Sequence, residues 1–357
     1  MAIIASQLII SALFYNYPAR KEAMLQFTKL NFVTLLIHIT NKVSPTELIF
    51  TFNGDSSLLK DVVLKDKVSK KYSLHLDPHA IIIANHQIYS DWLFVWYLAY
   101  LNNCADQIFI VMKKSLQRIP AIGFGMRNFS FIFLTRNWAA DRDYMWLQFN
   151  KICHLGSKCW VLIFPEGTNM SSGTIVTSNN FAKKIGSKPT KYVLLPRARG
   201  LYLSCKSLAK TTSTLYDLTL GYSGHTSEQM AQDIYSLRNI YLLGKAPQTV
   251  SIHISAYNLQ NDIPRVDFTG TATSPLSTEQ EEHEIEQFND WLAKLWYKKD
   301  QWMKHYYETG KFPDTDGREY RVQLKLRNRL EIFNVYIIPA LSVMFAYLIF
   351  SAVRLML

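Results

Sequence analysis

The chain has 357 residues, of which 48% are hydrophobic, and its 39 Lys and Arg exceed its 28 Asp and Glu. This apolar share excludes a disordered protein, and four cysteines in such a length exclude a small scaffold held by disulfides. A mean hydropathy of −0.03 excludes a bundle of many membrane helices but allows one or two spans.

The basic excess is concentrated in three windows. Residues 107–140 carry five bases and no acid, residues 169–216 carry eight bases and no acid, and residues 318–329 carry five bases and one acid. Windows of this kind are typical of proteins that handle an anionic partner. Nucleic acid, phosphorylated cofactors and lipid head groups are the candidates, against the alternative of solvated surface charge.

Residues 1–50 are predicted to form an N-terminal membrane-anchoring region. Met1–Tyr17 is apolar and uncharged but marginal in length for a span, and it lacks the basic start of a signal peptide. Met24–Ile39 is apolar apart from Lys29 and His38. It could cross the membrane or lie in the interface, so the number of crossings stays open.

Residues 51–264 are predicted to form one α/β domain, a mixed sheet covered by helices. Asp91–Leu101 indicates a helix. Short apolar runs indicate strands at 80–84, 107–112, 129–134, 160–164, 192–195 and 216–222. The four cysteines show neither C-x-x-C spacing nor a His partner at zinc-finger spacing, which predicts reduced thiols and no metal site.

Residues 265–330 are predicted to comprise a polar linker and an amphipathic helical region that ends at Gly310 and Pro313. Residues 331–357 contain Ile332–Val353, 22 residues without a charged side chain. That length predicts a C-terminal transmembrane helix, with a buried core helix as the alternative. The basic residues just before it place this flank in the cytosol by the positive-inside rule.

A His and an Asp directly after the strand at 80–84 are the first candidate catalytic pair. His86 and Asp91 would point about 140° apart on one helix, so they can meet only if His86 lies in the turn and Asp91 at the helix start. Asp91 could then orient the His86 ring, whose other nitrogen would act as a base. No Ser or Cys nearby stands out as a nucleophile, which favours direct attack by a substrate hydroxyl.

Three further motifs also follow predicted strands. They are Phe133-Leu134-Thr135-Arg136, Phe164-Pro165-Glu166-Gly167-Thr168 and Leu194-Leu195-Pro196-Arg197. Arginine suits bidentate phosphate binding, and glycine permits a positive φ or a close backbone approach. Ligands collect at the carboxyl ends of strands in α/β sheets, so the series predicts one composite site.

With Asn85-His86 and Asp91, these motifs resemble the four ordered blocks of the glycerolipid acyltransferase family, from about Ala80 to Leu201. The surrounding sequence is similar to fungal lysophosphatidylinositol and lysocardiolipin-type acyltransferases. That similarity is carried by Ile81–Trp92, Gly123–Asn137 and Phe164–Asn169. One position departs from the family pattern, because Ser130 stands where the second block often begins with Gly.

The resemblance implies a role for each matched residue. His86 would be the general base and Asp91 its orienting partner. The lysophospholipid would be positioned by Asn85, Arg136, Glu166, Gly167 and Thr168, with Arg136 on its phosphate. Pro196 and Arg197 would contribute to acyl-CoA or acceptor binding.

The resemblance further implies transfer of an acyl group from acyl-CoA to a lysophospholipid, with lysophosphatidylinositol the preferred acceptor. Acceptors such as 1-acylglycerol-3-phosphate or lysocardiolipin, and a catalytically silent lipid-binding protein, are the alternatives. We expect acyl-CoA as co-substrate, no resident cofactor, membrane lipid as a partner and no nucleic acid. The expected location is the endoplasmic reticulum membrane or the lipid droplet, with the site facing the cytosol.

Overall fold

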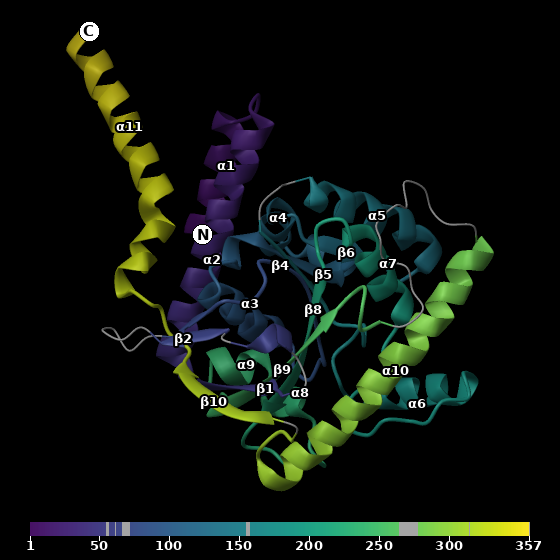
Figure 1. The fold of residues 1–357 in the computed structure, drawn as a ribbon. Coiled ribbons are helices and arrows are strands. Elements are labelled where there is room, and N and C mark those ends of the chain that lie inside the picture. Colours follow the sequence, from purple (N-terminus) through teal and green to yellow (C-terminus); the bar gives the residue numbers. More distant parts are fainter. Residues whose placement is uncertain are drawn as a thin grey trace.

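A computed structural model describes residues 1–54, 57–60, 62–65, 72–154, 158–263, 278–313 and 315–356. Its centre is an eight-stranded mixed sheet in the order β10-β1-β9-β8-β4-β7-β5-β6 (Figure 1). The strands are β1 (Glu47–Asn53), β4 (His79–Ala84), β5 (Ile108–Lys113), β6 (Ile132–Leu134), β7 (Cys159–Ile163), β8 (Thr214–Tyr222), β9 (Thr249–Asn258) and β10 (Thr315–Gln323). A small hairpin joins β2 (Val63–Lys65) and β3 (Tyr72–Leu74).

Five neighbouring strands of the sheet, β8, β4, β7, β5 and β6, run parallel. Their carboxyl ends therefore lie along one edge, which we call the carboxyl edge. Beyond β8, β9 is antiparallel to β8, β1 is parallel to β9, and β10 is antiparallel to β1. The sheet thus has the mixed character predicted for this fold class.

Helices cover both faces of the sheet, which explains the unbroken apolar run of β4. Ile82 packs into one core with α2 (Pro18–Val43) and α3 (Asp91–Leu101). Ile81 and Ile83 point into the other core, with α5 (Trp138–Cys153), α7 (Ala198–Leu208) and α10 (Thr278–Thr309). The remaining helices are shorter or peripheral: α4 (Ile122–Asn128), α6 (Ser172–Lys184), α8 (Ala231–Ile234), α9 (Leu237–Tyr241), and the 3-10 turns η1 (Ser57–Leu59), η2 (Ala105–Gln107), η3 (Lys114–Arg118) and η4 (Arg329–Phe333).

The N-terminal region is partly a core element of the domain. Lys29 of α2 is fully buried; its Nζ donates to the Ile108 carbonyl at 3.0 Å and lies 4.3 Å from the centre of the Phe109 ring. The stretch at 24–39 therefore packs against β5 of the sheet through Lys29. The preceding helix, α1 (Ala2–Leu13), is apolar but only 12 residues long.

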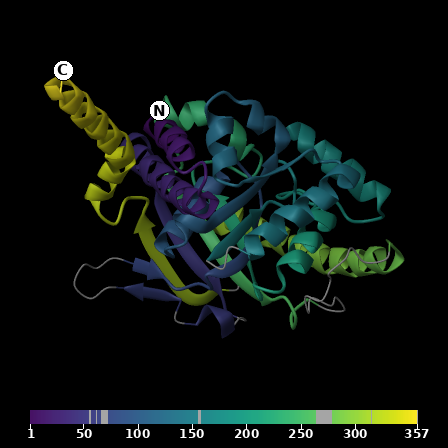
Figure 2. The same ribbon diagram turned by 90° about the horizontal axis from the view of Figure 1, so that it is seen from above.

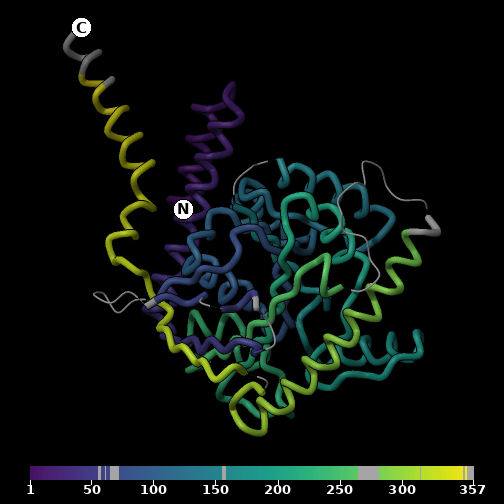
Figure 3. Tube along the Cα trace, in the orientation of Figure 1, coloured from purple at the N-terminus to yellow at the C-terminus, as the bar shows by residue number. Residues whose placement is uncertain are grey.

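One helical stretch in the described part of the chain, Arg329–Leu348, is long and apolar enough to cross a membrane. It comprises η4 and most of α11 (Asn334–Met356), whose side chains are mostly exposed, for example Val343 at 71%. The alternative of a buried core helix is therefore wrong. In both ribbon views α11 leaves the domain beside the N-terminal helices, and α10 lies on the far side (Figures 1 and 2). The Cα trace shows α1 and α11 rising from the same side (Figure 3).

Two predicted strands are corrected. Residues 192–195 form no strand, because the Asp300 carboxylate of α10 accepts the backbone N–H groups of Lys191, Tyr192 and Val193 at 2.6–3.2 Å. The strand expected at 129–134 begins only at Ile132, because the preceding residues end α4 and turn through a left-handed Ser130.

The predicted domain limits do not coincide with breaks in the fold. The limit at residue 50 cuts β1, and the region 265–330 contributes β10 to the same sheet as well as α10. The helix predicted to end at Gly310 does end there, with Gly310 at φ +75°. The predicted linker at 265–278 falls almost entirely outside the described residues.

Candidate active site

The His86–Asp91 pair lies at the carboxyl edge, in the turn between β4 and α3. His86 Nδ1 and Asp91 Oδ2 are 2.8 Å apart, and Asp91 is the first residue of the helix, as the sequence pattern requires for the two side chains to meet. Asp91 is fully buried, whereas 18% of the His86 side chain is exposed. The arrangement leaves Nε2 of His86 as the ring nitrogen that is not turned toward Asp91.

Asp91 accepts hydrogen bonds from other groups in addition to its contact with His86. Its Oδ2 accepts the backbone N–H groups of Gln87 at 2.6 Å and Ile88 at 3.1 Å, and its Oδ1 accepts the Tyr222 hydroxyl. Burial and the Asp91 charge raise the pKa of Tyr222 well above its usual value, so this phenol stays a proton donor. The His86 ring stacks on Phe164, with centroids 4.3 Å apart. Carboxylate and imidazole are therefore both fixed in orientation.

Asn85 is turned into the sheet. Its side-chain amide donates to the Leu220 carbonyl at 3.0 Å and accepts the Leu220 N–H at 2.8 Å. The side chain is fully buried, so in this structure it ties β4 to β8. The amide thereby fixes the start of the loop that carries His86.

Glu166 lies just beyond the end of β7 and is buried. Its Oε1 accepts the indole N–H of Trp296 at 3.1 Å, whereas Oε2 is buried and has no hydrogen-bond partner among the described residues. Burial raises the pKa of Glu166 to about 8, opposed by donors such as the Trp296 N–H and by the charge of Lys299. The carboxyl group is thus largely protonated at neutral pH. Gly167 follows with φ +73°, and Thr168 is half-buried.

Backbone hydrogen bonds connect three of the four blocks. The Arg197 N–H donates to the Pro165 carbonyl at 2.7 Å, and the Met170 N–H donates to the His86 carbonyl at 2.8 Å. Pro196 is buried, and the Arg197 guanidinium lies over the Phe181 ring, 3.5 Å from its centre. The first, third and fourth blocks therefore form one continuous structure.

Arg136 is organised separately, after β6. It is exposed and left-handed, with φ +68°, and its backbone N–H donates to Asp141 at 2.7 Å. Asp141 also accepts the backbone N–H and the hydroxyl of Thr135, both at 2.8 Å. Within the described chain, no hydrogen bond or ion pair joins Arg136 to the other three blocks. It stands three strands from β4, about 14 Å across the sheet.

Ser130 adopts φ +57°, a backbone conformation that glycine accepts at no steric cost. Ser130 adopts this conformation without a glycine, so the departure from the resembled pattern leaves the loop before β6 intact. Partial burial lowers the pKa of the Arg136 and Arg197 guanidinium groups, which nevertheless stay charged at neutral pH.

The sequence motifs do not include the residues that α10 contributes near the site. Besides Trp296 and Asp300, this helix provides Lys299, whose Nζ donates to Asp217 at 2.7 Å with both side chains fully buried. Lys299 also donates to the Leu218 carbonyl and the Thr219 hydroxyl. A signal was present, because Lys299 occupies an apolar-stripe position between Trp296 and Met303.

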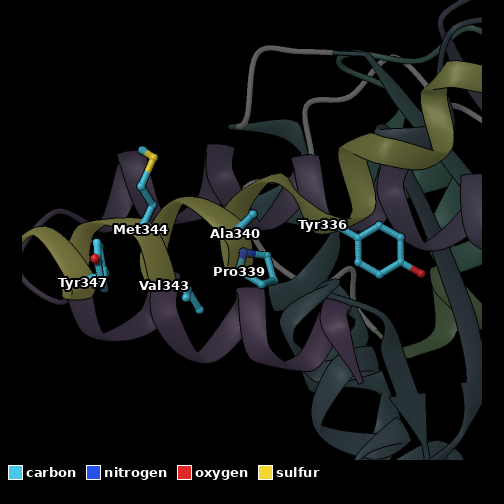
Figure 4. Close-up of a pocket in the computed structure, with 6 residues that line it drawn as sticks. All are labelled: Tyr336, Pro339, Ala340, Val343, Met344 and Tyr347. Carbon is cyan, nitrogen blue, oxygen red and sulfur yellow. The ribbon is translucent and has the colours of Figure 1, made fainter.

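No group of three His, Cys, Asp or Glu side chains that could hold a metal ion occurs in the described residues. Nor, within them, does a Ser, Thr or Cys side chain hydrogen-bond to His86. An apolar groove on α11, lined by Tyr336, Pro339, Ala340, Val343, Met344 and Tyr347, lies away from these blocks (Figure 4). An oriented imidazole without a side-chain nucleophile hydrogen-bonded to it among the described residues is an arrangement suited to group transfer to a substrate hydroxyl.

Comparison with known proteins agrees with a group-transfer class. Residues 64–200 match the family model "Acyltransferase", and residues 276–338 match "Acyltransferase C-terminus". The chain is 36% identical to the 2-acyl-1-lysophosphatidylinositol acyltransferase of Saccharomyces cerevisiae, over 94% of this chain and 89% of the relative. It is 28% identical to lysocardiolipin acyltransferase 1 of Gallus gallus, over 67% of this chain and 57% of the relative.

The chain therefore belongs to the acyltransferase family and is an O-acyltransferase. The second family match covers all of α10, which supplies Trp296, Lys299 and Asp300 to the surroundings of the site. The catalytic unit accordingly extends beyond the first four blocks.

Proposed function

We propose that the chain catalyses acyl-CoA-dependent acylation of a lysophospholipid hydroxyl, with lysophosphatidylinositol as the first candidate acceptor. The observation that carries the chemistry is the oriented His86–Asp91 pair, which leaves Nε2 of His86 for the substrate. The similarity to the yeast lysophosphatidylinositol acyltransferase supports the choice of acceptor.

In the proposed reaction, Nε2 of His86 takes the proton of the acceptor hydroxyl while the oxygen attacks the thioester carbonyl carbon. The C–S bond breaks, an ester forms, and the CoA thiolate takes the proton from the His86 imidazolium to leave as the thiol. Asp91 stabilises the imidazolium during the step. The Phe164 ring against His86 keeps the imidazole from turning away.

Anionic groups of the substrates would meet the two arginines of the sequence blocks, Arg136 and Arg197. Arg136 and Arg197 form no ion pair within the described residues, and arginine binds phosphate with a planar fork of donors. We assign Arg136 to the lysolipid phosphate and Arg197, with Pro196, to acyl-CoA or the acceptor. Oε2 of Glu166 is buried and unpaired, and it is the oxygen of this side chain that could contact a substrate hydroxyl.

We assign the protein to the endoplasmic reticulum membrane, or to the lipid droplet, with the site on the cytosolic side. The apolar stretch Arg329–Leu348 supports a membrane location, and the basic residues ahead of it support a cytosolic flank. Acyl-CoA is available on that side.

The test is CoA release by the purified full-length chain with a panel of lysolipids and acyl-CoAs. We expect lysophosphatidylinositol to give the highest kcat/KM and His86→Ala to abolish turnover. The matched control is His75→Ala, since the His75 side chain is exposed and its ring hydrogen-bonds to Ser73. Preference for 1-acylglycerol-3-phosphate or lysocardiolipin would replace the acceptor assignment, and undiminished turnover in His86→Ala would refute the mechanism.

A further inference from the structure

The segment between β5 and α4 exposes apolar and basic side chains together. Ile119 and Ile122 are 39% and 58% exposed, and Lys113, Lys114 and Arg118 beside them are exposed as well. Residues 113–122 are called the interfacial segment below. Apolar side chains flanked by bases are typical of protein surfaces that lie on anionic lipid.

The exposure of the two isoleucines is built into the fold. The segment folds back on itself, with the Gly123 N–H donating to the Ile119 carbonyl at 2.8 Å and Ala121 left-handed at φ +59°. A Cβ on Gly123 would lie 2.1 Å from the Gln117 carbonyl oxygen, so only glycine fits this turn. The segment is thus a closed, ordered turn that holds Ile119 and Ile122 outward.

The bases of the interfacial segment are available to a partner. Among the described residues, Lys113, Lys114 and Arg118 form no ion pair, and the sequence from 107 to 140 has no acid. Two of the five bases ahead of α11 differ, because Arg318 pairs with Asp316 and Arg321 pairs with Glu47 and Glu319. The interfacial segment can therefore offer all three of its bases to an anionic surface.

The position of the segment indicates which surface it meets. It starts at the end of β5, on the same carboxyl edge as His86 and between β7 and β6. It leads into α4, which packs on α1: Asn128 donates to the Gln7 side chain at 3.2 Å, and Gln7 donates to the Gly125 carbonyl at 3.4 Å. Helix α1 in turn packs against α11, which contains most of the candidate span.

We propose that the interfacial segment docks on an anionic phospholipid bilayer, with Ile119 and Ile122 among the upper acyl chains and the three bases on lipid phosphates. The proposal builds on the membrane location assigned above and adds a second contact, at the carboxyl edge itself. Docking there sets the carboxyl edge, which carries His86, against the bilayer, so an acceptor lipid reaches His86 without leaving the membrane.

The test is the depth of a fluorescent label in vesicles. The full-length chain with Cys153→Ser, which leaves three buried thiols, receives Ile122→Cys and an environment-sensitive dye. The control is Val176→Cys on α6, where Val176 is 59% exposed and α6 lies at the opposite end of the domain from α11 (Figure 1). Vesicles contain neutral lipid with or without phosphatidylserine, and a lipid carrying a nitroxide on its acyl chain serves as quencher.

We expect blue-shifted emission and nitroxide quenching at position 122, and neither at position 176. Neutralising Lys114 and Arg118 to Gln should lower the ratio of docked to undocked protein about fivefold per base in phosphatidylserine vesicles. The proposal would be overturned if the dye emission at position 122 matched that at position 176. It would also be overturned if the dye at position 122 showed self-quenching that grows with protein density but no quenching by nitroxide, which would indicate a second copy of the chain as the partner. The measurement is repeated in His86→Ala, so a failure of docking and a failure of the proposed chemistry give separate results.

Discussion

Tyr222 provides the sharpest test of how the site is held together. Its hydroxyl donates to Oδ1 of Asp91 from β8, a strand that also carries the backbone partner of Asn85. Tyr222→Phe removes one hydroxyl and leaves a buried carboxylate oxygen without its donor. Because His86 is oriented by the other oxygen of the same carboxylate, we expect the change to reach catalysis.

A hydrogen bond to a charged acceptor contributes roughly 1.5–3 kcal/mol. If that energy is lost in the transition state, kcat falls about 10- to 100-fold, with little change in KM for either substrate. Initial rates of CoA release, with each substrate varied in turn, measure kcat and both KM values.

Tyr235→Phe is the matched control. The Tyr235 ring lies 6.2 Å from the Tyr222 ring, and its hydroxyl donates to the neutral Ser223 carbonyl. It should cost about 1 kcal/mol of unfolding free energy and leave kcat within about twofold. Equal losses of kcat in the two variants would show that Tyr222 acts only through stability.

Three further predictions concern the surroundings of the site. Lys299→Met should lower the unfolding free energy by roughly 3–5 kcal/mol because it strands the buried Asp217 charge, and adding Asp217→Asn should restore most of it in chemical denaturation. Gly167→Ala should destabilise the protein by roughly 1–2 kcal/mol because alanine is strained at a φ of +73°. Gly173→Ala, in helix α6 and with equally open space around it, should stabilise the protein by about 0.5–1 kcal/mol. Thermal unfolding of both variants measures these opposite shifts. The raised pKa of Glu166, about 8, stabilises the fold fully below about pH 4.5, and this stabilisation is lost as pH rises through 8. Glu166→Gln should therefore remove up to roughly 5 kcal/mol of the pH dependence of the unfolding free energy. Parallel plots of unfolding free energy against pH for wild type and variant would contradict this.

The sequence alone predicts those elements that depend on a short, continuous run of residues. The helix at 91–101 and the strand at 80–84 follow from continuous apolar runs, and His86 and Asp91 meet because both lie in the single turn between them. Spacing along the chain is enough for such a pair, since both residues belong to one short segment.

Contacts between distant segments were missed for a physical reason. Tyr222 is 131 residues from Asp91, and Asp300 is more than 100 residues from the amides it accepts. The run at 192–195 has the composition of a strand, but a carboxylate from α10 satisfies the backbone amides at its start. Propensity alone cannot show that such a distant acceptor exists, so the strand prediction at 192–195 was wrong.

The basic windows look similar in composition, but the structure shows that they differ in how their charges are paired. Two of the five bases in the window at 318–329, Arg318 and Arg321, form ion pairs within the domain. The window at 107–140 keeps its bases unpaired among the described residues and spans the ends of β5 and β6, which share the carboxyl edge with His86. Unpaired cations at the carboxyl edge can bind an anion that comes to that edge. The two proposed partners, the lysolipid and the phospholipid bilayer, both carry phosphate. Phosphate recognition by Arg136 and docking by the interfacial segment therefore make separable demands, because Arg136→Ala should raise KM for the lysolipid without changing label depth at position 122.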